Sequence, residues 1–106
     1  MSLMPEVDSI LRAAEEELRI VTHASEFAGE LGAEGSVTAG QCLWFMGDEA
    51  EVQEDLMDIA LAEGEAASQE EARKRRLYAE RLRHYAGLLR RAGVVPEPLR
   101  GGEGRG

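Results

Sequence analysis

The sequence predicts a small all-α domain, an antiparallel bundle of three long helices that is completed by dimerisation. Ala, Leu, Glu and Arg, which are strong helix formers, dominate the composition. The three prolines (Pro5, Pro96 and Pro98) lie near the two ends, so residues 6–95 contain none that would break a helix. Aromatic residues are only 5% of the chain, and Val and Ile are few, which disfavours strands.

The first helix is predicted over about residues 5–30. Pro5 suits a first helical position, and acidic residues in the first turn interact favourably with the helix dipole. Apolar residues at helical spacing form two strips on different sides: Val7, Ile10, Leu11, Ala14, Leu18 and Val21 on one, and Ile20, Ala24, Phe27 and Leu31 on the other. The glycines that follow at positions 29, 32 and 35 predict a turn.

The second helix is predicted over about residues 37–67, with Ser36 as its N-cap. It also has two apolar sides: Val37, Trp44, Phe45, Val52, Leu56 and Ile59 on one, and Leu43, Met46, Met57 and Leu61 on the other. A helix with two apolar sides contacts two neighbours, so we expect it to be the central helix. Gly40 and Gly47 each cost about 1 kcal/mol relative to alanine, which leaves open whether the helix breaks near Gly47.

The third helix is predicted over about residues 69–92. Ser68 and Glu71 have the spacing of a capping box at its start, and Gly93 suits the position after its end. Its apolar seam consists of Tyr78, Leu82, Tyr85 and Leu89. Residues 4–95 are therefore predicted to form one domain, and residues 96–106 a flexible tail rich in Gly and Pro.

The apolar strips predict both a core and a dimer. The residues expected in the core are Leu18, Val21, Val52, Leu56, Ile59, Leu82 and Leu89. Two helices have two apolar strips each and the third has one seam, so one strip remains without a partner. A second copy related by a two-fold axis would cover it, which predicts a homodimer, with binding of another protein as the alternative.

Several classes of protein are disfavoured. A single cysteine, Cys42, excludes a disulfide within the chain and a cysteine-rich zinc site. We expect this thiol to be partly buried and, among nearby carboxylates, to have a raised pKa. No run of 18 apolar residues predicts a membrane span, and no secretory signal pattern is present, so we expect a cytoplasmic protein that does not bind membranes.

The net charge of −9 is unevenly distributed. Residues 1–67 carry 16 acidic and two basic side chains, whereas residues 68–106 carry five acidic and ten basic ones. We interpret this as pairing between the acidic and basic segments, within the chain or between two copies. The alternative is nucleic-acid binding through Arg73–Arg76, Arg83 and Arg90, which the overall negative charge disfavours.

Four carboxylates, here named the acidic row, share one side of the second helix: Asp48, Glu51, Asp55 and Asp58. Such a row attracts a counter-ion, either arginines of the third helix or a hard cation such as Mg²⁺. Residues 48–51 resemble the E-x-x-E element of MazG-type all-α nucleotide pyrophosphohydrolases, with Asp48 in place of Glu. The resemblance implies a Mg²⁺-dependent enzyme, but the second E-x-x-D element of that family is missing.

The function predicted from these features is that of a non-enzymatic helical interaction or regulatory protein without a resident cofactor. No convergent catalytic set is apparent, and the charge is polarised along the chain. The natural interface anchors are the aromatic residues Trp44, Phe45, Tyr78 and Tyr85, although each could equally be an ordinary core residue. Glu17, between apolar positions, is expected to meet an arginine of the third helix or to lie at the helix rim.

Overall fold

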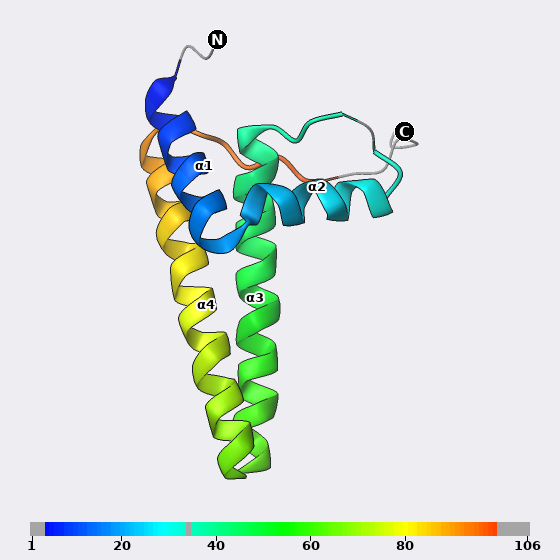
Figure 1. Cartoon of the computed structure of the whole chain (residues 1–106), viewed down its shortest axis with the longest axis vertical. Helices are drawn as coiled ribbons and strands as arrows, with labels where there is room; N and C mark the ends of the chain where they lie inside the picture. The colour runs from blue at the N-terminus through cyan, green and yellow to red at the C-terminus, as the bar shows by residue number, and fades with distance from the viewer. Residues whose placement is uncertain (1–3, 34, 100–106) are drawn as a thin grey trace.

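The computed structural model describes residues 4–33 and 35–99, and this part of the chain is all-α, as predicted. It contains four helices and no strand: α1 (Pro5–Leu18), α2 (Ile20–Glu30), α3 (Ala39–Glu63) and α4 (Ala66–Arg91). The two long helices α3 and α4 run antiparallel, while α1 lies against α4 and α2 crosses α3 (Figure 1).

The hairpin of α3 and α4 is closed by only two residues, Gly64 and Glu65. Gly64 has φ of 77°, a left-handed conformation that costs glycine little, and it ends α3. The capping box predicted at Ser68 is wrong, because α4 already begins at Ala66 and the Ser68 hydroxyl donates to the carboxylate of Glu63 instead. The question about Gly47 is also answered, since α3 is continuous through it.

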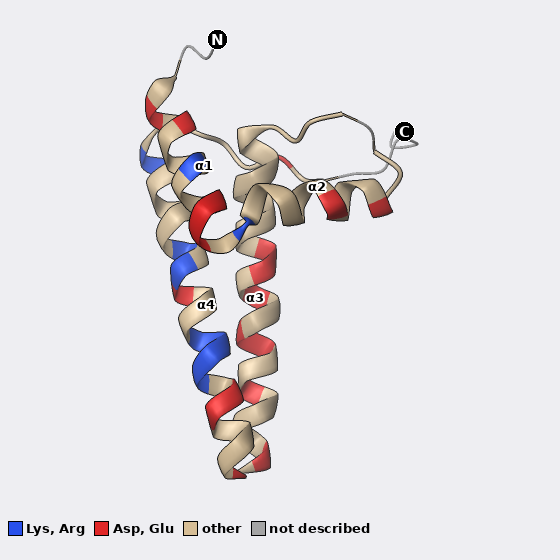
Figure 2. Cartoon of the chain, viewed as in Figure 1, with Lys and Arg blue, Asp and Glu red and all other residues tan. Residues whose placement is uncertain are grey.

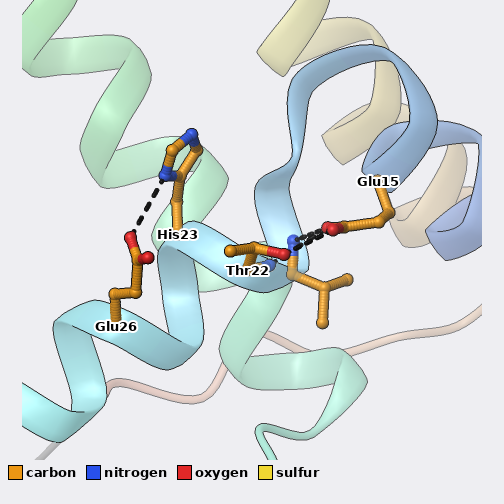
Figure 3. Close-up of polar contacts among 5 residues, drawn as sticks. Glu15, Thr22, His23 and Glu26 are labelled. Atoms are coloured by element: carbon orange, nitrogen blue, oxygen red, sulfur yellow. Dashed lines mark hydrogen bonds and ion pairs between the residues drawn. The ribbon is translucent and has the colours of Figure 1, made fainter.

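The single helix predicted over residues 5–30 is two helices in the structure. Arg19 separates them with φ of 55° and ψ of 37°, the left-handed region. The carboxylate of Glu15 caps the new helix start: the N–H groups of Val21 and Thr22 donate to Oε1 at 2.8 and 3.0 Å, and the Thr22 hydroxyl donates to Oε2 (Figure 3). A negative charge at the positive end of the α2 dipole adds to this stabilisation.

Because of this break, α1 and α2 together cover only one end of the hairpin (Figure 1). Residues 52–76, here named the distal arm, extend beyond them as two helices alone. The radius of gyration is 15.2 Å, larger than the roughly 13 Å of a compact domain of this length. The structure is therefore a long helical hairpin with a short covering layer, rather than three helices of equal length.

The core lies where this layer meets the hairpin. Leu82 and Leu89 are fully buried, as predicted, and Leu18 and Val21 pack against the core as partly buried residues. The prediction is wrong for three residues of α3, since Val52, Leu56 and Ile59 are 43, 36 and 59% exposed. Val52 lies at the edge of the layer, where it lines a hollow with residues of α2, whereas no residue of α1 or α2 lines the depression that contains Leu56 and Ile59. The residues that α3 buries are Cys42, Leu43, Phe45, Met46, Ala50, Gln53 and Ala60.

Two bidentate ion pairs hold the elements in register. Arg81 of α4 donates to both carboxylate oxygens of Glu17 of α1, at 2.6 and 2.9 Å, and the Tyr85 hydroxyl donates to the same carboxylate at 2.6 Å. This confirms that Glu17 meets an arginine of the last helix. Arg83 pairs likewise with Glu54 of α3, with both distances 2.8 Å. In both cases the basic segment of the chain pairs with the acidic one.

The chain after α4 returns to the beginning of α3. Gly93, with φ of 95°, ends α4 in a Schellman motif, as its position in the sequence predicted. The N–H of Glu97 then donates to the carbonyl of Gly40 at 2.9 Å. The N-cap of α3 is Thr38, not the predicted Ser36, and its hydroxyl donates to Glu97 at 3.0 Å. Residues 100–106 of the predicted tail lie outside the described residues.

Gly40→Ala is expected to lower the free energy of unfolding by about 1–3 kcal/mol, because overpacking at a close contact forces the backbone apart. A Cβ at this position would lie 2.5 Å from the carbonyl oxygen of Val95 and 3.2 Å from Cβ of Glu97. Gly47→Ala on the same helix is the matched control. Its Cβ would meet nothing within 4 Å, so it should stabilise the protein by about 0.5–1 kcal/mol. Urea denaturation measures both changes, and equal effects would contradict the proposed close contact.

Glu17→Gln is expected to change how stability depends on pH. The Arg81 guanidinium and the Tyr85 hydroxyl lower the pKa of Glu17 from 4.5 to about 2. A carboxyl whose pKa is lowered on folding stabilises the folded state above its unfolded pKa, and this contribution is lost as the pH falls towards the folded pKa. The wild type should therefore exceed the variant in stability near neutral pH and lose this advantage between about pH 5 and 2. Glu16→Gln, an exposed neighbour, should retain the wild-type pH dependence in the same denaturation series.

Candidate interaction surface

The acidic row lies on one side of α3, and two of its members, Asp48 and Glu51, line a shallow depression with Arg90 of α4. Asp48 is half-buried, and Glu51, Asp55 and Asp58 are exposed. Among the described residues, no cation lies within ion-pairing distance of the row, and no three His, Cys, Asp or Glu side chains are grouped closely enough to hold a metal ion. Figure 2 shows acidic residues along α3 opposite basic residues along α4. The row therefore makes no ion pair among the described residues, although the charge of Glu51 contributes, after that of Glu54, to raising the pKa of Arg83.

The four aromatic residues predicted as interface anchors divide into two pairs. Phe45 and Tyr85 are buried, at 6 and 7% exposure, and belong to the core. Trp44 and Tyr78 are half-buried and each lines a surface depression. This second pair is therefore the more accessible to another molecule, although Phe45 also lines the depression that contains Tyr78.

A hollow of about 370 Å³ opens in the angle between α2 and the hairpin. Residues of three helices line it: His23, Glu26, Phe27 and Glu30 of α2, Phe45, Asp48, Glu49 and Val52 of α3, and Tyr78 of α4. The α2 residues were not predicted as site residues. The sequence feature that could have identified them is Phe27, which belongs to the second apolar strip of the first predicted helix.

Where α2 crosses α3, two of its three buried residues are small. Ala24 and Ala28 are buried on the inner side of α2, and the rings of Phe27 and Phe45 pack with centroids 5.7 Å apart. The cap that Glu15 provides holds the beginning of this helix. One turn further on, the side chain of His23 lies 3.6 Å from that of Glu26 at the rim of the hollow (Figure 3).

The electrostatic character of the hollow is negative. Four carboxylates line it, those of Glu26, Glu30, Asp48 and Glu49, against a single histidine. Burial, and then the nearby charge of Glu49, raise the pKa of the Tyr78 hydroxyl. An aromatic floor beneath several carboxylates favours an organic cation, because a ring face and a negative rim both attract positive charge.

A chain of polar side chains crosses the hairpin below the hollow. Gln53, the one buried polar residue of the described chain, donates to Glu49 at 2.9 Å and accepts from Arg75 of α4 at 2.8 Å. Arg75 also pairs with Glu71 at 2.6 Å. This arginine, part of the basic run considered for nucleic acid, is thus bound within the hairpin, as is Arg83.

None of the described helices combines the length and hydropathy needed to cross a membrane.

The hollow continues along the distal arm as an apolar stripe formed by Val52, Leu56 and Ile59. These residues are spaced i, i+4 and i+7, so they follow one side of α3, and Val52 belongs to both features. Leu56 and Ile59 also line a shallow depression between the helices with Ala60, Ala67 and the Glu71–Arg75 pair. We name the hollow and the stripe together the binding face. It runs from Phe45 to Ile59, about 21 Å along α3.

No protein-family model, curated protein or solved structure matches this chain. The functional interpretation therefore rests on the geometry of the binding face.

Glu15→Ala is expected to loosen the beginning of α2 and, with it, the hollow. Losing an N-terminal cap typically costs about 0.5–2 kcal/mol. The amide hydrogens of Val21 and Thr22, which donate to this carboxylate, should exchange faster with solvent. Glu16→Ala removes the same charge one residue further on and should leave both amides protected. Unchanged exchange at Val21 and Thr22 in Glu15→Ala would contradict the capping role.

Proposed function

We propose that this chain is a non-enzymatic interaction protein, which acts by binding another protein chain on the binding face. The observation that carries the proposal is the exposed stripe of Val52, Leu56 and Ile59 on an arm that the rest of the described chain leaves uncovered. Contiguous exposed apolar surface with a polar rim is typical of protein–protein contact sites. The hollow at one end of the stripe supplies an aromatic pocket, the usual place for an anchoring side chain.

Either a second copy of this chain or a different protein would cover the stripe. The homodimer expected from the sequence stays a prediction, as does a cytoplasmic location. Sedimentation equilibrium at micromolar concentrations tests the homodimer. A mass that stays at 11.6 kDa at every concentration would contradict it and leave a different protein as the partner.

The alternative function, a Mg²⁺-dependent pyrophosphohydrolase, has less support. Cation-dependent phosphate chemistry needs carboxylates that converge on one point. The acidic row instead follows a straight helix over eleven residues, and its members Glu51, Asp55 and Asp58 face solvent. We therefore interpret the row as the negative edge of the binding face.

The double substitution Leu56→Gln and Ile59→Gln is expected to change the free energy of unfolding by less than about 1 kcal/mol, since both side chains are already exposed in the free chain. Leu82→Ala, in the fully buried core, should by contrast cost about 2–5 kcal/mol. Chemical denaturation measures both. A loss above about 2 kcal/mol for the stripe variant would show that the stripe serves folding rather than binding.

A further inference from the structure

We infer that the occupant of the binding face is a basic amphipathic helix of a different protein, lying along the distal arm with one end in the hollow. This inference rests on the proposed function and specifies the partner. It combines the charge around the face, the length and direction of the stripe, and the poor fit of a second copy.

The charge around the face specifies a basic partner. Four carboxylates line the hollow, and Asp55 and Glu63 lie one helical turn from Ile59 on either side. The cations at the face are few, and Arg75 is already bound to Glu71 and Gln53. A negative rim beside an apolar stripe attracts a chain with Lys and Arg around apolar residues. It repels nucleic acid and anionic lipid, which are themselves negative.

The shape of the face specifies a helix. The stripe is straight, parallel to α3 and about 21 Å long with the hollow included, which a helix of about 14 residues or more can cover. The described chain contains no strand, so an extended peptide would find no sheet edge with which to pair its backbone. A helix satisfies its own backbone groups and can present apolar residues at i, i+4 and i+7 opposite Val52, Leu56 and Ile59.

A second copy fits this face less well. A two-fold contact with antiparallel arms stacks α3 on α3, so the two acidic rows come together and repel. With parallel arms, the two hollows, each lined by four carboxylates, meet at the same end and repel. Placing the basic side of α4 on this face is a head-to-tail contact, which leads to open polymers rather than a dimer.

The test uses a synthetic helical peptide as the probe. It has about 18 residues, with Leu at helical spacing on one side and Lys and Arg elsewhere. Its control has the same Leu positions with Glu in place of every basic residue. Fluorescence anisotropy of the labelled peptides with the full chain should show binding of the basic peptide only. Raising the salt from about 0.05 to about 0.5 M should weaken this binding by screening.

Matched variants locate the contact. Ile59→Gln should weaken binding of the basic peptide by about tenfold or more, while Leu61→Gln should change it by less than about twofold. Both residues are on α3 and similarly exposed, 59 against 52%, but Leu61 faces the opposite side of the arm. Asp48→Asn with Asp55→Asn should weaken binding, whereas Glu16→Gln with Glu80→Gln removes two charges elsewhere and should have little effect. Circular dichroism at each step shows that the variants remain folded.

Four outcomes would overturn the inference, and the last of them also overturns the proposed function. Equal binding of the acidic peptide would exclude a basic partner, and equal effects of Ile59→Gln and Leu61→Gln would exclude this face. Self-association of the free chain that Ile59→Gln abolishes would identify a second copy as the occupant. That last result would leave the proposed interaction function intact. The proposed function itself fails if neither peptide binds and the free chain stays monomeric.

Discussion

The left-handed turn at Arg19, held by the carboxylate of Glu15, determines how much of the hairpin is covered. A continuous helix over residues 5–30 would be about 39 Å long, enough to follow α3 from end to end. The turn instead directs α1 along α4 and sends α2 across α3 (Figure 1). The hollow, the uncovered arm and the exposed stripe all follow from this one change of direction.

Sequence periodicity located the long helices but could not say which strip finds a partner. It identified the apolar side of α3 that contains Val52, Leu56 and Ile59, and the buried seam with Leu82 and Leu89. Whether an apolar strip is buried depends on what another segment covers, and that depended on the break at Arg19. A signal for the break was present, because one apolar strip ends at Val21 just after another, on a different side, begins at Ile20.

The candidate site was predictable only in part, for a similar reason. The acidic row follows from helical spacing alone, and α3 displays it on one side as expected. The hollow joins residues of three helices, and its α2 wall depends on the packing of α2 across α3. Helical spacing alone could not distinguish the aromatic residues that are buried in the core, Phe45 and Tyr85, from those that are half-buried at the surface, Trp44 and Tyr78.

The burial of Cys42 has a consequence for the dynamics of the covering layer. Its thiol is 1% exposed in the part of α3 that lies within the core, and burial together with the charge of Glu15 raises its pKa to about 11. A protonated, enclosed thiol does not react with alkylating reagents at neutral pH. Alkylation therefore requires a local opening of this end of the molecule. The rate of thiol modification then reports how readily the α1–α2 layer separates from the hairpin.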